Sequence, residues 1–141
     1  NDKAKAITTK GWAHVDELGW LNRKEIALVL KRSIAGFLLF HPAPNHVHSK
    51  PIKLFEYMSS GIPVIASNFQ LWKSIIEGND CGICVNPLEP KTIARAIDFL
   101  LNNPDRAKLM GANGRMAVTK LYNWSNEERK LIRLYNDLLK E

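Results

Sequence analysis

The sequence predicts an α/β fold in which a parallel β-sheet carries helices on both faces, a doubly wound arrangement. Three short apolar segments, at positions 34–40, 62–67 and 81–86, have the length and continuity of buried strands. Segments with helical spacing of apolar residues separate them, and the links are short. Strands that alternate with helices in this way are typical of a parallel sheet. With 141 residues, 45% of them hydrophobic, the chain is expected to form one domain with a buried core.

The first part of the chain is predicted to form a strand, a helix and a second strand. Positions 14–21, HVDELGWL, indicate a strand with turn residues around it. Asn22 is a suitable N-cap for a helix over positions 23–33, in which apolar residues share one face. The continuous apolar run at 34–40 then indicates a strand covered on both faces.

The middle of the chain repeats the same alternation. Pro51 stands where a helix would begin, and Gly61 stands where it would end. Positions 62–67 indicate a buried strand, and positions 71–78 a short helix that ends in glycine. Positions 81–86 indicate a third buried strand.

The remainder, positions 90–141, is predicted to be a helical tail of the same domain. One helix spans 90–101, and Pro104 opens a second. Ser125 is expected to cap a last helix, which has the apolar spacing of an amphipathic helix. The apolar face of that last helix consists of Leu131, either Leu134 or Tyr135, and Leu138.

Charge and composition restrict the partners. The net charge of +6 favours anionic ligands, but the basic residues are spread along the chain and are not interleaved with aromatic residues, so no nucleic-acid partner is expected. The longest apolar run, at 34–40, is too short to cross a bilayer, and the chain does not open like a secretory signal. We therefore expect a cytoplasmic protein, for which the positive charge would suit the inner face of an anionic membrane.

Cys81 and Cys84 form a C-x-x-C pair, which is compatible with half a zinc site, a redox pair or two buried thiols. A structural zinc ion needs four ligands, and the sequence has no second cysteine pair. We favour buried thiols in a reducing compartment.

His41, His46 and His48 lie within eight residues and raise the question of a metal site. His46 and His48 would face the same way in an extended segment, so a site with two ligands is one interpretation. No Asp, Glu or Cys accompanies them in the loop. We favour the rim of a pocket, and no metal is predicted.

The start of the helix at Pro51 is the predicted ligand site. In a parallel sheet, ligands bind beyond the carboxyl ends of the strands, where this helix directs its free N–H groups and its positive dipole end. One polar face carries residues at three- and four-residue spacing, namely Ser49, Lys53, Glu56 and Ser60. A phosphate at the helix start would meet Lys53, and Glu56 could accept two hydrogen bonds from a diol. An ordinary solvated helix face shows the same pair and is the alternative interpretation.

Positions 49–67, SKPIKLFEYMSSGIPVIAS, resemble the nucleotide-sugar-binding segment of GT-B glycosyltransferases, and of the large retaining family 4 in particular. In that family a helix of the type K-x-x-E-Y-M, or E-A-M, precedes a pair of small residues and G-x-P-V-I. The similarity continues through positions 81–115 and 122–139, the latter like the closing Trp helix of the family. Positions 14–33 resemble the strand and helix just before the site.

The resemblance implies roles for particular residues. Glu56 matches the second acid of the family's E-x7-E motif, which holds the ribose hydroxyls of the nucleotide. Pro51, Ile52 and Lys53 match the helix start that lies against the diphosphate. The region whose backbone contacts the nucleobase matches Gly19, Trp20, Leu21 and Asn22.

Two departures from the family pattern stand out. The first acid of E-x7-E, which usually holds hydroxyls of the donor sugar, falls on His48, and a histidine supplies no fixed negative charge at neutral pH. Positions 1–10 do not resemble the Gly-rich turn and the Arg and Lys pair of the family, and the acceptor-binding amino-terminal lobe is absent. We therefore interpret residues 1–141 as part of a carboxyl-terminal donor-binding lobe. The predicted substrate-binding residues are His48, Ser49, Pro51, Ile52, Lys53 and Glu56.

The expected parent enzyme transfers a hexosyl group from a UDP- or GDP-sugar to an acceptor hydroxyl with retention, in cell-envelope polysaccharide or glycolipid synthesis. Its helix dipole and cations would stabilise the leaving nucleoside diphosphate. We predict no catalytic side chain and no cofactor, since the nucleotide-sugar is the substrate. The expected partners are that donor, the amino-terminal lobe and, through exposed apolar surface, a second copy of the chain. The alternative is a non-catalytic α/β interaction module with a basic surface.

Overall fold

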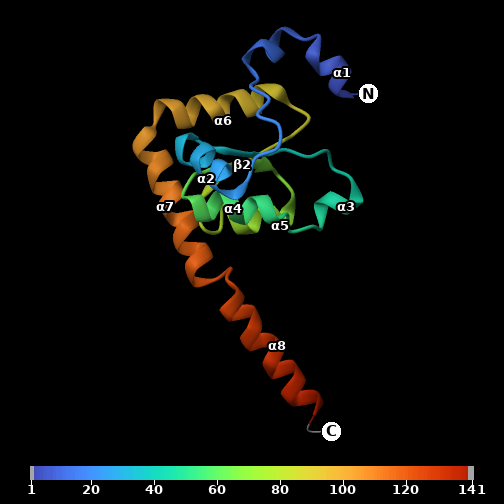
Figure 1. Ribbon diagram of the computed structural model, residues 1–141, viewed down its shortest axis with the longest axis vertical. Helices are drawn as coiled ribbons and strands as arrows, with labels where there is room; N and C mark the ends of the chain where they lie inside the picture. Colours follow the sequence, from blue (N-terminus) through green and yellow to red (C-terminus); the bar gives the residue numbers. More distant parts are fainter. Residues whose placement is uncertain (1, 140–141) are drawn as a thin grey trace.

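The computed structural model of the chain describes residues 2–139 and contains a three-stranded parallel sheet with helices around it (Figure 1). The strands β1 (Gly36–Leu38), β2 (Val64–Ser67) and β3 (Gly82–Val85) lie side by side in the order β1-β2-β3. All three point the same way, so their carboxyl ends meet at one edge of the sheet. The three predicted strands at 34–40, 62–67 and 81–86 are therefore confirmed.

Helices cover both faces of this sheet, as predicted (Figure 1). The helices α4 (Ile52–Ser60) and α5 (Gln70–Ile76) lie on one face, because right-handed crossovers between successive neighbouring strands place their helices on the same side. The helix α6 (Pro90–Asn102) covers the other face (Figure 1). The helices of the described part are α1 (Asp2–Ile7), the 3-10 helix η1 (Lys10–His14), α2 (Arg23–Arg32), α3 (Pro44–Val47), α4 (Ile52–Ser60), α5 (Gln70–Ile76), α6 (Pro90–Asn102), α7 (Pro104–Lys120) and α8 (Trp124–Leu138).

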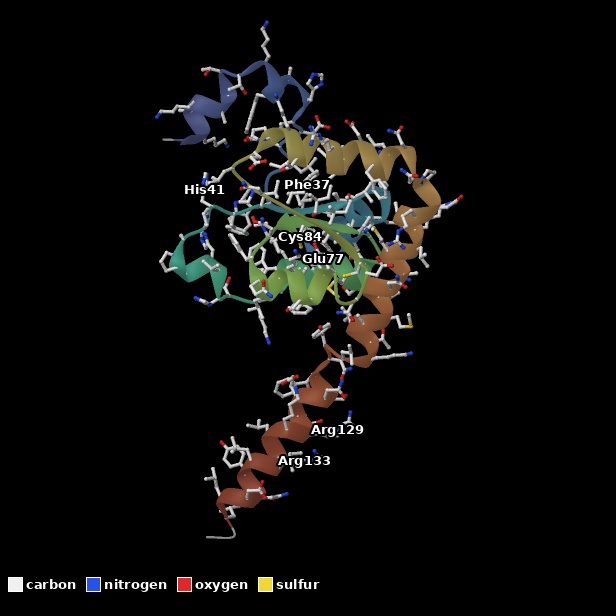
Figure 2. The ribbon with its side chains drawn as sticks, turned by 180° about the vertical axis from the view of Figure 1, so that it is seen from behind. Phe37, His41, Glu77, Cys84, Arg129 and Arg133 are labelled. Carbon is white, nitrogen blue, oxygen red and sulfur yellow. The ribbon has the colours of Figure 1, made fainter. Side chains whose placement is uncertain are left out.

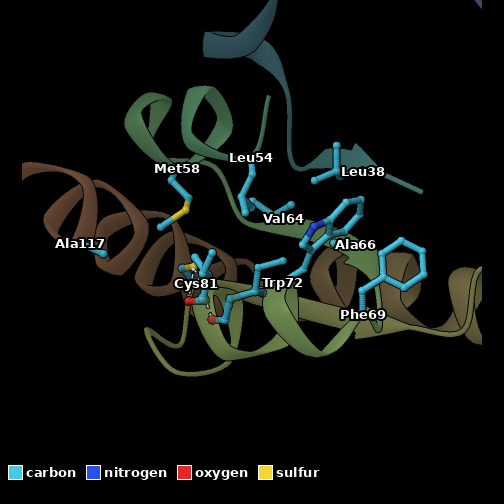
Figure 3. Packing of buried hydrophobic residues seen from close by; sticks show 11 residues of the cluster. Leu38, Leu54, Met58, Val64, Ala66, Phe69, Trp72, Cys81 and Ala117 are labelled. Atoms are coloured by element: carbon cyan, nitrogen blue, oxygen red, sulfur yellow. Dashed lines mark hydrogen bonds between the residues drawn. The ribbon is translucent and has the colours of Figure 1, made fainter. Parts of the chain in front are cut away.

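The larger part of the core lies between the sheet and the helices α4 and α5 (Figure 3). Leu54 and Met58 of α4 are completely buried there, and so is Trp72 of α5. Val64 and Ala66 of β2 point into the same cluster. This packing fixes which side of α4 faces the sheet and which side faces outward.

The opposite face of β2 packs against α6 and the first half of α7. Ile65 of β2 lies there with Ala96 and Leu100 of α6 and Met110 of α7. Side chains alternate between faces along a strand, so neighbouring residues of β2 are buried on opposite sides. A strand covered on both faces requires a continuous apolar run, which is the pattern that predicted it.

The predicted strand at positions 14–21 does not form. η1 ends at His14, and none of the described residues between it and α2 joins the sheet. Trp20 is fully exposed, at 103%, and Gly19 has a positive φ of 67°. The apolar residues of this segment have no sheet face against which to pack, so their spacing alone does not produce a strand.

The helix caps follow the sequence with one exception. Asn22 accepts hydrogen bonds from the backbone N–H groups of Lys24 and Glu25, and the Glu25 carboxylate accepts one from the N–H of Asn22, which completes a capping box. The predicted cap of α2 is therefore confirmed. The cap of α8 is Asn123 and not Ser125, because the Asn123 side chain accepts the N–H of Asn126.

Three helices, α6, α7 and α8, make up the part of the chain from Pro90 to Leu138. α6 and α7 pack onto the domain, whereas α8 projects away from it (Figure 1). None of the helices in the described part combines the length and the apolar character that a membrane crossing requires.

Candidate functional site

The site is built where β1 leads into α4. The chain leaves β1, forms the short helix α3, and enters α4 at Pro51, whose extended backbone (φ −70°, ψ 134°) makes it the N-cap. No side chain caps this helix start. The first N–H groups of α4 therefore remain available to a ligand at the carboxyl edge of the sheet, next to the positive end of the helix dipole.

Two opposite charges stand beside this helix start. Lys53 and Glu56 are exposed on the side of α4 that faces away from the buried Leu54 and Met58. Among the described residues, no ion pair engages either charge. A cation in the first turn and a carboxylate one turn later are thus both free to contact a ligand.

Glu56 also influences its neighbour Tyr57. Burial raises the pKa of the Tyr57 hydroxyl, and the negative charge of Glu56 raises it further. The Tyr57 hydroxyl donates a hydrogen bond of 3.4 Å to the carbonyl of Phe37 in β1. This contact ties the turn of α4 that carries Glu56 to the edge strand.

The three histidines of the loop have different surroundings. His41 lies at the start of the loop (Figure 2). The His46 Nδ1 is 3.1 Å from the carbonyl oxygen of His41, and its ring packs 4.8 Å from the ring of Phe40. His48 is the exposed C-cap residue of α3. Among the described residues, no group of three or more His, Cys, Asp or Glu side chains could hold a metal ion.

The structure brings six of the predicted site residues to one place. They occupy the end of the loop and the first two turns of α4, and the Ile52 side chain is 76% exposed there. The predicted nucleobase segment, Gly19 to Asn22, precedes α2, and Asn22 uses its side chain to cap that helix. The residues gathered at the start of α4 are His48, Ser49, Pro51, Ile52, Lys53 and Glu56.

Polar residues that the sequence analysis missed follow the other two strands at the same edge. Asn68 comes directly after β2 and is exposed. Asn86 follows β3, where its side-chain Oδ1 accepts the N–H of Leu88 and its side-chain Nδ2 donates to the Glu89 carboxylate. A polar residue immediately after a buried strand of a parallel sheet is the signal that would have found Asn68.

The cysteines are structural. Both are free thiols, Cys81 is buried, and burial raises the pKa of Cys81 to about 11 and that of Cys84 to about 12. The Cys81 thiol donates to the carbonyl of Ile76. Because burial raises both pKa values, both thiols are protonated at neutral pH, which disfavours thiol exchange.

A shallow surface hollow lies elsewhere, at the opposite end of α4. It measures about 460 Å³, and its walls include Gly61, Lys108 and Arg115. Gly61 ends α4, whereas Pro51 begins it, so this hollow is remote from the helix start. The helix start is bordered by the loop of residues 41–51 on the side of β1.

The fold and the site together define the class of the protein: a Rossmann-like α/β unit with an uncapped helix start at the carboxyl edge of its sheet. The glycosyl transferases group 1 family matches residues 2–117, and the chain belongs to this family. The resemblance stated from the sequence is thus confirmed.

Several relatives support this assignment. The chain is 35% identical over 80 residues to a GDP-mannose-dependent alpha-(1-6)-phosphatidylinositol monomannoside mannosyltransferase of Mycobacterium tuberculosis, a match that covers 57% of the chain and 21% of the relative. It is 28% identical over 98 residues to a D-inositol 3-phosphate glycosyltransferase of Acidothermus cellulolyticus, covering 70% of the chain and 21% of the relative. The matches span about a fifth of the length of these curated relatives.

A solved structure shows the same fold. Sucrose-phosphate synthase from Thermosynechococcus elongatus superimposes with a TM-score of 0.78 at 25% identity, over 91% of this chain and 31% of the synthase chain. The predicted α/β architecture is confirmed by this likeness.

Proposed function

We propose that this chain binds the nucleotide-sugar donor of a glycosyltransferase. The enzyme would transfer a hexosyl group from an NDP-sugar to an acceptor hydroxyl with retention, in cell-envelope polysaccharide or glycolipid synthesis. The observation that carries the proposal is the uncapped start of α4, with Lys53 and Glu56 exposed beside it at the carboxyl edge of the sheet.

In this proposal the diphosphate lies against the first turn of α4. The N–H groups of Ile52 and Lys53, the helix dipole and the Lys53 ammonium group would stabilise the negative charge that develops on the leaving nucleoside diphosphate. Glu56, one turn further along, would accept hydrogen bonds from the ribose hydroxyls. His48 would contact the hexosyl group as a hydrogen-bonding partner.

The donor is proposed to be of the GDP or UDP type. The name of the mycobacterial relative specifies GDP-mannose, which makes GDP-mannose the first donor to test. No metal ion and no cofactor enter the proposal, because the helix start and Lys53 supply the positive charge.

Calorimetric titration with GDP-mannose, GDP and UDP tests the proposal directly. Lys53→Ala and Glu56→Ala should each weaken binding by about tenfold, because each removes a charge-assisted hydrogen bond. Lys108→Ala removes the same charge beside Gly61, at the other end of α4, and should leave the affinity unchanged. Glu128→Ala on α8 is the matching control for Glu56→Ala.

The alternative function is a non-catalytic interaction module with a basic surface. That function is supported if Glu56→Ala has no effect and if Lys53→Ala and Lys108→Ala weaken ligand binding equally. Such a result would mean that the general charge of +6 attracts the ligand, without a defined site.

A further inference from the structure

The loop between β1 and α4 is attached to the core at its first end by Ser67. This serine is the last residue of β2 and is completely buried. Its hydroxyl accepts a hydrogen bond from the N–H of Phe40 and donates one to the carbonyl of Phe40, both at 2.9 Å. One buried side chain therefore satisfies both backbone groups of the residue at which the loop begins.

The second end of the loop is attached by Trp72. The indole of Trp72 is completely buried in α5, and its N–H donates to the carbonyl of Ser49 at 2.7 Å. The centroid of its ring lies 4.7 Å from the ring centroid of Phe69 and 5.8 Å from that of Phe40, which it meets edge-on. Ser49 lies two residues before Pro51, so this bond acts directly on the approach to α4.

Further contacts make the loop one unit between these attachments. The ring of His46 lies against Phe40 and against the carbonyl of His41. The Ser49 hydroxyl donates to the carbonyl of His46 at 2.9 Å. The ring of His46, one of the three histidines that raised the question of a metal site, therefore braces the loop against Phe40 and the backbone of His41.

We infer that Ser67 and Trp72 are positioning residues of the donor site, an inference that rests on the proposed function. They hold residues 40–51 in one conformation and so determine where His48 and the start of α4 lie. Neither side chain is accessible to a ligand, because both are completely buried. If the loop moved away, a buried hydroxyl and a buried indole N–H would each lose their partner, which is costly inside an apolar core.

Hydrogen–deuterium exchange of the ligand-free chain tests this role. Trp72→Phe keeps an aromatic ring in the core but removes the N–H, and Ser67→Ala removes the hydroxyl. Each should accelerate exchange of the loop amides of His46, Val47 and Ser49 by about three- to tenfold, while exchange of the strand β2 stays unchanged. Phe69→Leu alters the same cluster without removing a side-chain bond to the loop, and should not accelerate these amides selectively.

Titration with GDP and UDP provides the second measurement. Trp72→Phe and Ser67→Ala should each bind GDP and UDP less tightly than Phe69→Leu, when the variants are compared at temperatures equally far below their melting temperatures. The reason is that these two changes displace the start of α4, whereas Phe69→Leu changes only the core. Unchanged loop exchange, or exchange that rises equally in β2, would overturn the inference. The two variants act on opposite ends of the loop. If one of them does not fold, the other still tests the inference.

The two proposals fail in different ways. If the unmodified chain binds neither nucleotide, the proposed function is wrong, while the exchange of the ligand-free loop still tests the attachment by Ser67 and Trp72. If the chain binds nucleotide but the loop amides of both variants exchange normally, only the positioning role is wrong.

Discussion

At the scale of single residues, Gly36 determines how closely α4 approaches the sheet. A Cβ atom at this position would lie 2.3 Å from Cγ of Tyr57 and 2.4 Å from the next ring atom. Real carbon atoms do not approach so closely, so the Tyr57 ring occupies space that only glycine leaves free. The position of Tyr57 in turn fixes the neighbouring Glu56 of the candidate site.

We expect Gly36→Ala to destabilise the fold by about 1–3 kcal/mol, because the Tyr57 ring or the edge strand must shift to accommodate the methyl group. Urea denaturation measures this as a lower midpoint. Gly11→Ala is the matched control, because a Cβ at Gly11 meets no atom within 4 Å. Equal midpoints for the two variants would show that the Tyr57 ring moves without cost.

At the scale of elements, glycines also allow α7 to pack onto α4. A Cβ at Gly111 would lie 2.0 Å from the carbonyl oxygen of Gly61, and one at Gly114 would lie 3.3 Å from Cα of Met58. The backbone of α7 therefore approaches α4 directly at two points three residues apart. This contact holds α4 from the side of α7, and the sheet holds it through Leu54 and Met58.

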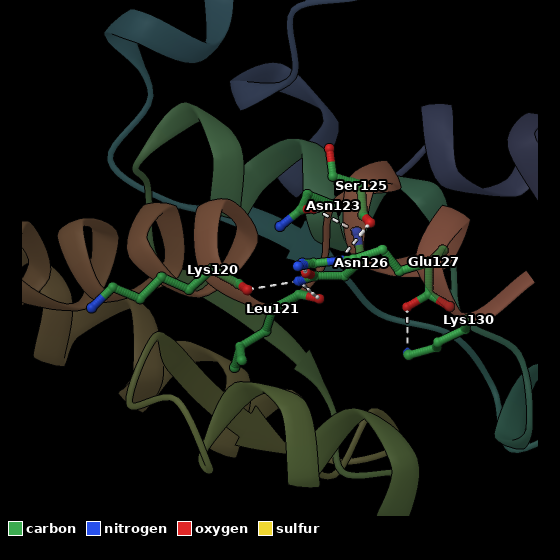
Figure 4. Close-up of polar contacts among 8 residues, drawn as sticks. Lys120, Leu121, Asn123, Ser125, Asn126, Glu127 and Lys130 are labelled. Carbon is green, nitrogen blue, oxygen red and sulfur yellow. Dashed lines mark hydrogen bonds and ion pairs between the residues drawn. The ribbon is translucent and has the colours of Figure 1, made fainter. Parts of the chain in front are cut away.

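The helix α8 has a different relation to the domain. No residue of α8 is buried, and exposed apolar side chains include Leu131, Leu134 and Tyr135. Its junction with α7 is polar, since the Asn126 amide donates to the carbonyls of Lys120 and Leu121 (Figure 4). The helix thus presents an unpaired apolar face.

A chain shortened to end at Asn123 should keep the melting temperature of the complete chain within about 2 °C, because the removed residues of α8 are exposed and contribute little to stability.

The complete chain should self-associate through the apolar face of α8. This helix has three basic and three acidic residues, so it has no excess positive charge, which favours contact with a second protein surface over contact with an anionic membrane. Sedimentation velocity should show a mass that rises with concentration for the complete chain alone. A complete chain that stays monomeric would contradict the predicted self-association. A shortened chain that unfolds would contradict the predicted melting temperature.

At the scale of the whole molecule, β1 forms one edge of the sheet that the described residues make. β1 is paired on one side only, and Phe37 remains 46% exposed at that edge. Arg129 and Arg133 lie on the projecting α8, well away from His41 and the candidate donor site (Figure 2). The donor edge is therefore separate from the exposed helix.

We expect the 141-residue chain by itself to bind donor without transferring the sugar. Transfer needs an acceptor held in line with the donor, and such orientation contributes about 7–11 kcal/mol to catalysis. Chromatography of reactions that contain GDP-mannose and methyl α-mannoside should show no disaccharide above background. Sustained transfer by the pure chain, abolished in Glu56→Ala, would refute this expectation.

Elements with local signals can be predicted from the amino-acid sequence alone. The three strands were predicted from their apolar runs, and α4 was predicted from Pro51 and Gly61 at its ends. Residues at three-residue spacing on a helix lie on the same side, and Lys53 and Glu56 of α4 are both exposed. Such signals act within a few residues and do not depend on distant parts of the chain.

Tertiary structure decided what depends on distant parts of the chain. The strand predicted at 14–21 was wrong because a strand needs a sheet neighbour, and no periodicity supplies one. The attachments of the loop join residues 27 and 23 positions apart, Ser67 to Phe40 and Trp72 to Ser49. The packing of α5 on the sheet brings Trp72 to Ser49, and the pairing of β1 with β2 brings Ser67 to Phe40. A buried donor bonds to whichever acceptor the fold brings within reach.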